Sequence, residues 1–301
     1  MWTRDPRCGG VIKRAWDVKI IGSKCFNLCR KQSLTAKALK KWNREEFGLC
    51  QTKIKELNNK IEEIQKMSMN ETNARIEASL EGDLNEWMRR NEVLWKQKCR
   101  ELWLKDGDRI SNFFHLSTII RRKRNSIDAI KSDEGEWITC KKEIREHVVE
   151  KFSHLFTEEP VLFPIDLEQL ISPSISDAEN ADLCRIPTGQ EIKAMIFEMH
   201  SQKAPGPDGL PALFYQRYWN IVGSTVIEAI QSFFRFGRIL KEVNNSLLVL
   251  IPKINSPSSV KHFRPISLCN TVYKTISKLL VSRLRPLLEK LISPCQSASS
   301  V

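Results

Sequence analysis

Apolar residues recur at helical spacing through the first third of the chain. Cys50, Ile54, Leu57, Ile61 and Ile64 follow one another at intervals of four, three, four and three residues, so they share one stripe of a helix. This pattern predicts helical structure from about residue 34 to 67. A second run of the same period, over about 76–94, predicts an antiparallel partner helix. An intermolecular coiled coil is the alternative, although the stripe lasts only about two to three heptads.

The periodicity changes beyond residue 105. Lys105–Asp108 breaks the second run, and Asp108 is a candidate N-cap for a helix over 109–122. Alternating apolar positions with a Asp-Glu-Gly turn then predict a small hairpin near 125–139. A helix over 141–156 follows. The stretch 159–187 is rich in Pro, Ser and Asp, and we interpret it as a connector at a domain boundary.

The last third mixes helical and extended patterns. Thr188 and Glu191 form a capping-box pair, and Ser246–Pro252 is a continuous apolar run typical of a buried strand. Its expected partner is 262–268. Further helices are expected over about 188–199, 210–221, 224–236 and 272–291. The fold class predicted from these elements is α+β, predominantly helical, with a small antiparallel sheet.

Charge changes this picture more than composition does. The 301 residues are 41% hydrophobic and 28% charged, which allows a sizeable core, and the net charge is +12. Between residues 96 and 131, ten Lys or Arg face four acidic residues, so half of the excess charge lies in this window. Such clustering favours a surface that faces a nucleic acid, RNA or DNA, over that of a merely soluble basic protein.

The cysteine pattern and the apolar runs bear on metal binding and on the cellular compartment of the protein. The nine cysteines include no C-x-x-C pair, and no His or Cys completes a zinc set around Cys25 and Cys29, so we expect free thiols and no metal site. The start has no apolar run typical of a signal peptide, and no apolar stretch is long enough to span a membrane. These features predict an intracellular protein, in the nucleus or cytoplasm, that is not secreted and has no membrane partner.

Three short motifs carry a family resemblance. Lys203–Gly209 (KAPGPDG), Leu247–Lys253 (LLVLIPK) and Phe263–Leu268 (FRPISL) occur in this order, and Gln296–Ala298 follows. They resemble the first conserved blocks of the reverse transcriptase of non-LTR (LINE-type) retrotransposons, in particular those of plants. The segments Trp42–Gly48, Trp103–Arg109 and Asn112–His115 resemble the region after the endonuclease in the same polyproteins, so the resemblance covers nearly all of the chain.

The resemblance implies a domain order. Residues 1–33 would be a remnant of the segment after an endonuclease, and 34–158 a helical, basic N-terminal extension. The connector 159–187 would lead to a partial reverse-transcriptase domain, 188–301, which contains the fingers. This organisation implies nucleic-acid binding, with RNA or DNA as the partner and a deoxynucleotide as the substrate of the complete enzyme.

Lys253 and Arg264 are the candidate nucleotide-binding residues. On a hairpin they would project from one tip, and a point charge plus a forked donor suits a triphosphate. The resemblance implies the same role, because fingers hairpins of reverse transcriptases hold the incoming nucleotide's phosphates with a basic pair. The alternative is two solvated charges beside a loop.

Two further groups are candidates for binding template nucleic acid. The first is Lys203, Gly206 and Gly209, in a block that the resemblance places at the base of the fingers, near the template path. A loop with few side chains permits close backbone approach, and a rigid turn between helices is the alternative. The second is Arg121, Arg122, Lys123 and Arg124, which suits RNA or DNA phosphates, a nuclear localisation signal or a helix C-terminus. Phe113, Phe114 and Trp103 are either base-stacking or core residues.

The sequence lacks the residues that polymerisation requires. The family holds two Mg²⁺ ions with an Asp in an apolar strand and a later Tyr-x-Asp-Asp, and the chain contains no Asp-Asp pair. We therefore expect no catalytic residue, no cofactor in this chain, and a truncated enzyme that is inactive alone. The alternatives are a domesticated RNA-binding or scaffold protein and a helical-hairpin interaction module. The oligomeric state is not predicted.

Overall fold

The computed structural model describes residues 2, 5–47, 50–67, 70–99, 111–158 and 174–292. The chain forms two compact units, one from Met1–Lys19 and Lys31–Ser126, the other from Ile20–Arg30 and Ile127–Val301. The fold is predominantly helical with two small antiparallel sheets, which confirms the predicted α+β class. No helix within the described ranges is long and apolar enough to cross a membrane.

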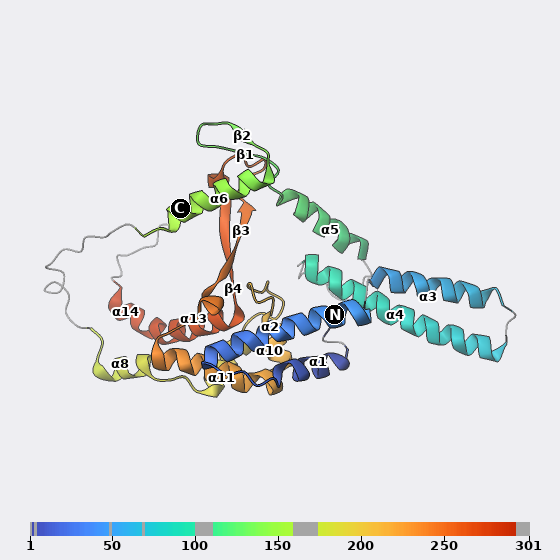
Figure 1. Ribbon diagram of the computed structural model, residues 1–301, viewed down its shortest axis with the longest axis horizontal. Helices are drawn as coiled ribbons and strands as arrows, with labels where there is room; N and C mark the ends of the chain where they lie inside the picture. The colour runs from blue at the N-terminus through green and yellow to red at the C-terminus, as the bar shows by residue number, and fades with distance from the viewer. Residues whose placement is uncertain are drawn as a thin grey trace. The chain divides into compact units, whose positions relative to one another are not determined.

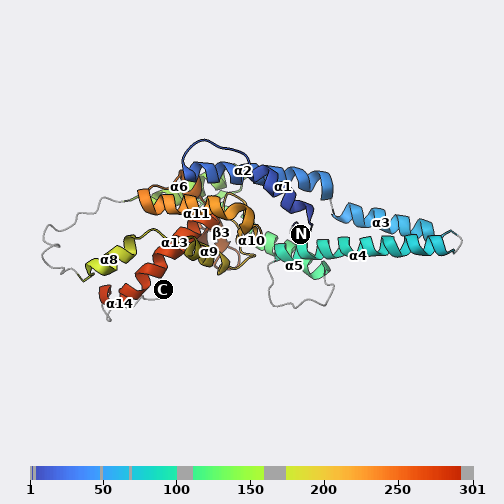
Figure 2. The same ribbon diagram turned by 90° about the horizontal axis from the view of Figure 1, so that it is seen from below.

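The first unit is built from helices. Its elements are α1 (Arg7–Trp16), the later part of α2 (Lys24–Trp42), the π-helical turn η2 (Asn43–Phe47), α3 (Cys50–Gln65), α4 (Glu71–Cys99) and α5 (Ser111–Arg124). The antiparallel pair predicted from the apolar stripe is α3 and α4, which lie side by side (Figures 1 and 2). Near the turn between them, Gln65 Nε2 donates to Glu77 Oε1 at 2.6 Å.

Helix α1 was not predicted from the sequence. It buries Cys8, Ile12 and Trp16 on one face, at the i, i+4, i+8 spacing that a helix requires. Its start is fixed by Asp5, a buried carboxylate that pairs with Arg7 at 3.0 Å and with Arg90 of α4 at 3.8 Å. The hydrogen bond from Arg7 holds the pKa of Asp5 below its usual range.

The second unit contains a layer of helices. These are α8 (Asp177–Cys184), α9 (Gly189–Phe197), α10 (Ala212–Arg217), α11 (Trp219–Phe236), α12 (Lys241–Asn244), α13 (Thr271–Leu284), the 3-10 turn η4 (Arg285–Leu287) and α14 (Leu288–Leu291). The buried side chains of α9, α11 and α13, such as Ile196, Val222 and Leu279, form its core. The capping box at the start of α9 is confirmed, with Glu191 N donating to Thr188 Oγ1.

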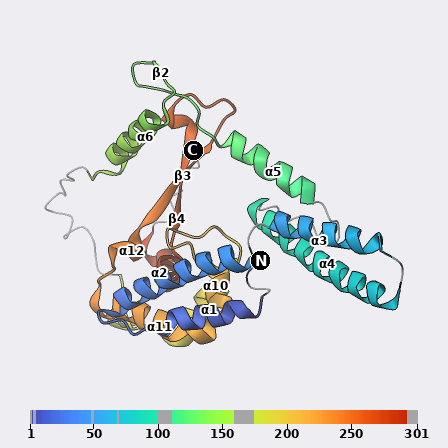
Figure 3. The ribbon, with the colours of Figure 1, turned by 45° about the vertical axis from the view of Figure 1, so that its right-hand side comes forward.

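A long two-stranded ribbon rises from this helical layer. Strand β3 (Ser246–Pro252) pairs antiparallel with β4 (Phe263–Cys269), from Ser246 opposite Cys269 to Pro252 opposite Phe263 (Figure 3). The strand and its partner are confirmed, but the prediction that Ser246–Pro252 is buried is wrong. Leu247 is 53% and Ile266 41% exposed, because among the described residues no third strand or helix layer covers the ribbon along its length.

The far end of the ribbon packs against a small cap. It consists of β1 (Ile130–Lys131), β2 (Trp137–Ile138) and α6 (Lys141–Phe156), where β1 and β2 form the expected short hairpin around a turn at Gly135, φ +88°. Buried Ile130, Ile144 and Phe263 form the core of this contact. The cap therefore belongs to the same unit as the ribbon.

Several element boundaries differ from the prediction. The helical run expected from about residue 34 to 67 is two helices, α2, which begins at Lys24, and α3, which begins at Cys50. The expected single helix 272–291 changes to 3-10 geometry at Arg285, because Pro286 lacks the N–H that an α-helix needs. Helices α10 and α11 meet at Tyr218, four residues before the expected gap. Part of the connector, Asp177–Cys184, is the helix α8. The expected N-cap Asp108, the motif Trp103–Arg109, residues 159–173 of the connector and Gln296–Ala298 lie outside the described residues.

Candidate functional site

The tip of the ribbon, residues 252–264, brings Lys253 and Arg264 to one end of the hairpin. Arg264 lies opposite Ile251, and Lys253 N donates to His262 O at 2.8 Å, which continues the ladder by one residue. Because side chains alternate along a strand, Lys253 shares a face with Ile251 and hence with Arg264. Both cations are exposed.

Short-range hydrogen bonds shape the tip. The Nδ1 atom of His262 accepts from the backbone N–H groups of Ser258 and Ser259 at 3.2 and 3.3 Å. The Lys253 ammonium donates to Lys261 O at 3.0 Å. Lys131 N, in the cap, donates to Ser258 O at 2.7 Å. The connection between the strands is therefore held both by its own polar groups and by the cap.

Positive charge gathers around this tip. The cations Lys131, Lys253, Lys261 and Arg264 belong to the tip or to the strand bonded to it. The hairpin bonded to the tip also carries Asp133, Glu134 and Glu136, and the carboxylate of Asp133 is paired with Lys151, whose hydrogen bond lowers the pKa of Asp133. With Lys151 included, five cations stand against three carboxylates. An anion that approaches the tip therefore meets more positive than negative charge.

At the opposite end of the ribbon lies a tight turn, Gly206–Gly209, which we call the base turn. Gly209 N donates to Gly206 O at 3.0 Å, and Gly209 has φ +72°, which only glycine adopts without strain. A Cβ on Gly206 would lie 2.5 Å from the backbone nitrogen of Asn270. The close approach that this glycine permits is thus to the chain's own backbone, as the rigid-turn interpretation requires. Lys203 lies exposed just before the turn.

Asp208 is the charged residue within the base turn. Its carboxylate accepts from Leu210 N at 3.1 Å and from the Tyr215 hydroxyl at 3.4 Å. Burial raises the pKa of Asp208 to about 6, although these hydrogen bonds and the charge of Lys274 oppose the rise. The carboxylate serves the turn and the first residues after it.

Four basic residues end α5 in the first unit. The guanidinium of Arg121 donates to Cys99 O, the last residue of α4, so this side chain serves the fold. Arg122, Lys123 and Arg124 are exposed. Phe114 is only 3% exposed and is a core residue, whereas Phe113 lies at the surface. Trp103 lies outside the described residues.

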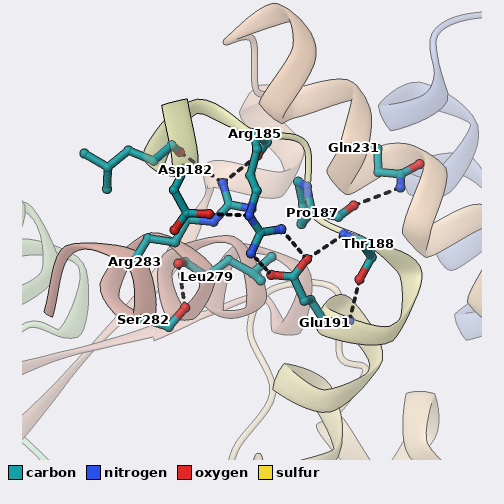
Figure 4. A network of polar contacts seen from close by, with 10 residues as sticks. Asp182, Arg185, Pro187, Thr188, Glu191, Gln231, Leu279, Ser282 and Arg283 are labelled. Atoms are coloured by element: carbon teal, nitrogen blue, oxygen red, sulfur yellow. Dashed lines mark hydrogen bonds and ion pairs between the residues drawn. The ribbon is translucent and has the colours of Figure 1, made fainter. Parts of the chain in front are cut away.

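A second polar cluster, which the sequence pattern did not predict, joins α8, α9 and α13 (Figure 4). The buried Arg283 donates through Nη1 to Leu183 O and Arg185 O at 3.0 and 2.6 Å, which satisfies carbonyls at the end of α8. Arg185 in turn pairs with Asp182 and Glu191, and the pKa of Glu191 falls to about 2, chiefly through that hydrogen bond. Burial lowers the pKa of Arg283. This cluster orients helices.

The described ranges contain no group of three or more His, Cys, Asp or Glu side chains that could hold a metal ion. The arrangement is instead a basic tip at one end of an exposed ribbon and a close-packed turn at the other.

Sequence comparison identifies relatives among mobile genetic elements. No protein-family model matches the chain. Over 202 residues, 66% of its length, the chain is 28% identical to an uncharacterized 149 kDa protein of transposon TX1 from Xenopus laevis. Over 84 residues, 28% of its length, it is 30% identical to a retrovirus-related Pol polyprotein of the type-1 retrotransposable element R2 from Bradysia coprophila.

Both relatives are proteins of non-LTR retrotransposons, which supports a retrotransposon origin for this chain. The aligned segments span 15% and 9% of those two proteins. The chain thus corresponds to a small part of each relative.

Proposed function

We propose that this chain supplies the fingers side of a non-LTR retrotransposon reverse transcriptase, of the type found in plants. In this role the tip of the β3–β4 ribbon contacts the triphosphate of the incoming deoxynucleotide. The observation that carries the proposal is the register of the ribbon, in which Lys253 and Arg264 share one face at one end. The order of the three motifs and the retrotransposon relatives support it.

The chemistry of the pair suits a triphosphate. An ammonium provides a compact charge, and a guanidinium provides a planar fork that binds two phosphate oxygens at once. Hydrogen bonds to charged groups contribute about 1.5–3 kcal/mol each. Because the ammonium of Lys253 also donates to a backbone carbonyl, its position is partly fixed before a nucleotide arrives.

We further propose that these 301 residues bind substrate but do not polymerise it. The family's paired aspartates do not occur in the sequence, and bound phosphates alone do not supply the metal-held charge that nucleotidyl transfer requires. The same proposal includes template contacts by Lys203, Gly206, Gly209 and the end of α5. The packing of Gly206 against the chain's own backbone argues against a template contact by this residue.

The test is a binding measurement with a fluorescent deoxynucleoside triphosphate. We expect K253A/R264A to weaken binding at least tenfold, which corresponds to about 1.4 kcal/mol. The matched control is R238A/K241A, which removes one exposed Arg and one exposed Lys near the other end of β3. It should change the affinity less than twofold, and the corresponding deoxynucleoside should not distinguish the variants. Equal losses in both pairs, or none in K253A/R264A, would refute the role.

A second candidate is a noncatalytic RNA-binding protein derived from such an element. The exposed cations Arg122, Lys123 and Arg124 favour it. It predicts RNA binding that is unaffected by K253A/R264A, together with no binding of the triphosphate.

A further inference from the structure

Asn270 occupies an unusual position at the base of the ribbon. It is the N-cap residue of α13 and is only 3% exposed. An asparagine at an N-cap ordinarily accepts a hydrogen bond from the second or third N–H of its helix. In α13 this bond is absent, because the side chain is directed elsewhere.

The Asn270 amide instead joins three segments. Its Oδ1 accepts from Asp208 N, in the base turn, at 3.1 Å. Its Nδ2 donates to Glu242 O and Val243 O, in α12, at 2.9 and 3.1 Å. The oxygen and the nitrogen of this amide thus both form hydrogen bonds with buried or half-buried backbone groups. Asparagine is one of the few side chains that offer a donor and an acceptor in this geometry.

These three segments meet at the base of the ribbon, whereas the cap holds its far end. Helix α12 leads directly into β3 at Ser246, and Asn270 directly follows Cys269, the last residue of β4. Ser246 and Cys269 pair with each other. One side chain therefore links the entry of β3, the exit of β4 and the base turn.

We propose that Asn270 is the positioning residue that sets where the ribbon holds Lys253 and Arg264. The inference rests on the proposed role of the tip in nucleotide binding. Seven residues of β3 span roughly 20 Å at about 3.4 Å per residue, so a rotation of about 5° at the base moves the tip by about 2 Å. Displacements of about 1 Å in a substrate-holding group can cost about a hundredfold in rate.

Asn270→Asp is the sharpest variant. When ionised, it keeps the acceptor for Asp208 N but places an oxygen against the carbonyls of Glu242 and Val243, where no hydrogen remains to bridge them, so the measurements are made well above neutral pH. Asn244→Asp is the matched control, since Asn244 is an exposed asparagine in α12, the helix that contains Glu242 and Val243.

Two measurements are made on the whole chain: hydrogen exchange, and affinity for the fluorescent triphosphate. In N270D we expect exchange at least about tenfold faster in the base turn and in the paired strands, with α11 unchanged. Affinity for the triphosphate should fall several-fold. N244D should match the wild type in both measurements.

The outcomes separate the two proposals. Local deprotection in N270D, combined with a wild-type chain that does not bind the triphosphate, supports the positioning role and contradicts the proposed function. Wild-type exchange in N270D, or equal acceleration throughout the second unit, overturns the positioning role. If N270D does not fold, Gly206→Ala disturbs the same contact from the other side. Loosening confined to the ribbon base would then support the inference, and uniform loosening would overturn it.

Discussion

Gly206→Ala tests whether the base turn is as closely packed as its geometry indicates. The added Cβ would lie 2.5 Å from both the backbone nitrogen and Oδ1 of Asn270, and 2.6 Å from the carbonyl carbon of Cys269. Ordinary contact begins near 3.4 Å, so the turn and the end of β4 would have to separate by about 0.9 Å. Two of these neighbours are backbone atoms, held by a strand and a helix.

The expected cost follows from this geometry. Overpacking a well-packed site costs about 1–3 kcal/mol, and a backbone neighbour places Gly206 toward the upper end. Replacing a glycine also stabilises by about 0.4–1 kcal/mol through the unfolded chain. We therefore expect a net loss of about 2 kcal/mol in the free energy of unfolding of the second unit, or about a thirtyfold change in its folding equilibrium.

Substitutions at two other glycines separate the cost of steric contact from the cost of backbone conformation. Gly209 has open space around its Cβ position but φ +72°, so Gly209→Ala should cost about 1–2 kcal/mol through strain alone. Gly82, inside α4, has open space and helical backbone, so Gly82→Ala should stabilise the first unit by about 0.5–1 kcal/mol.

The assay must resolve the two units, because they need not unfold together. Urea-dependent hydrogen exchange, read peptide by peptide, gives a free energy of unfolding for each. A Gly206→Ala chain whose second unit resists urea as well as the wild type would refute the close approach of the turn to Asn270.

Two further predictions concern titration and salt. Burial raises the pKa of Asp208 to about 6, above its value of about 3.9 in the unfolded chain. Between these pH values the folded chain therefore binds more protons at Asp208 than the unfolded chain does. As pH rises from about 4 to about 6, ionisation of Asp208 lowers the free energy of unfolding. Asp208→Asn should remove this contribution in urea titrations at stepped pH, and an unchanged pH dependence would contradict it. Replacing Arg122, Lys123 and Arg124 together by Gln should flatten the slope of log K against log salt by about two for single-stranded RNA, and an identical slope would exclude these side chains from the interface.

The elements that could be predicted are those with strong local signals. The helix Lys141–Phe156 and the capping box at Thr188 depend on residues close in sequence, and both are present as expected. The ribbon was predictable as a pair of strands from its apolar run and motif. Its exposure was not, because a short apolar run has the same composition whether or not another layer covers it.

The candidate site also contains residues that the sequence could predict and residues that it could not. Lys253 and Arg264 could be singled out because they flank the strands of a hairpin, and the register joins them at one end. Asn270 carries only the signal of an N-cap, a polar residue between a strand and a helix. Its partners, Asp208 and the carbonyls of α12, lie 62 and about 27 residues away and are brought together only by folding.

The proposed contact between the ribbon tip and the triphosphate of a deoxynucleotide can be tested directly. The most direct measurement is photocrosslinking with a deoxynucleoside triphosphate that carries an azidoanilide on its γ-phosphate, followed by peptide mapping. We expect labelled peptides that contain residues 253–264, with labelling suppressed by excess unmodified triphosphate but not by the deoxynucleoside. Labelling that lies elsewhere in the chain, or that the triphosphate does not suppress, would contradict it.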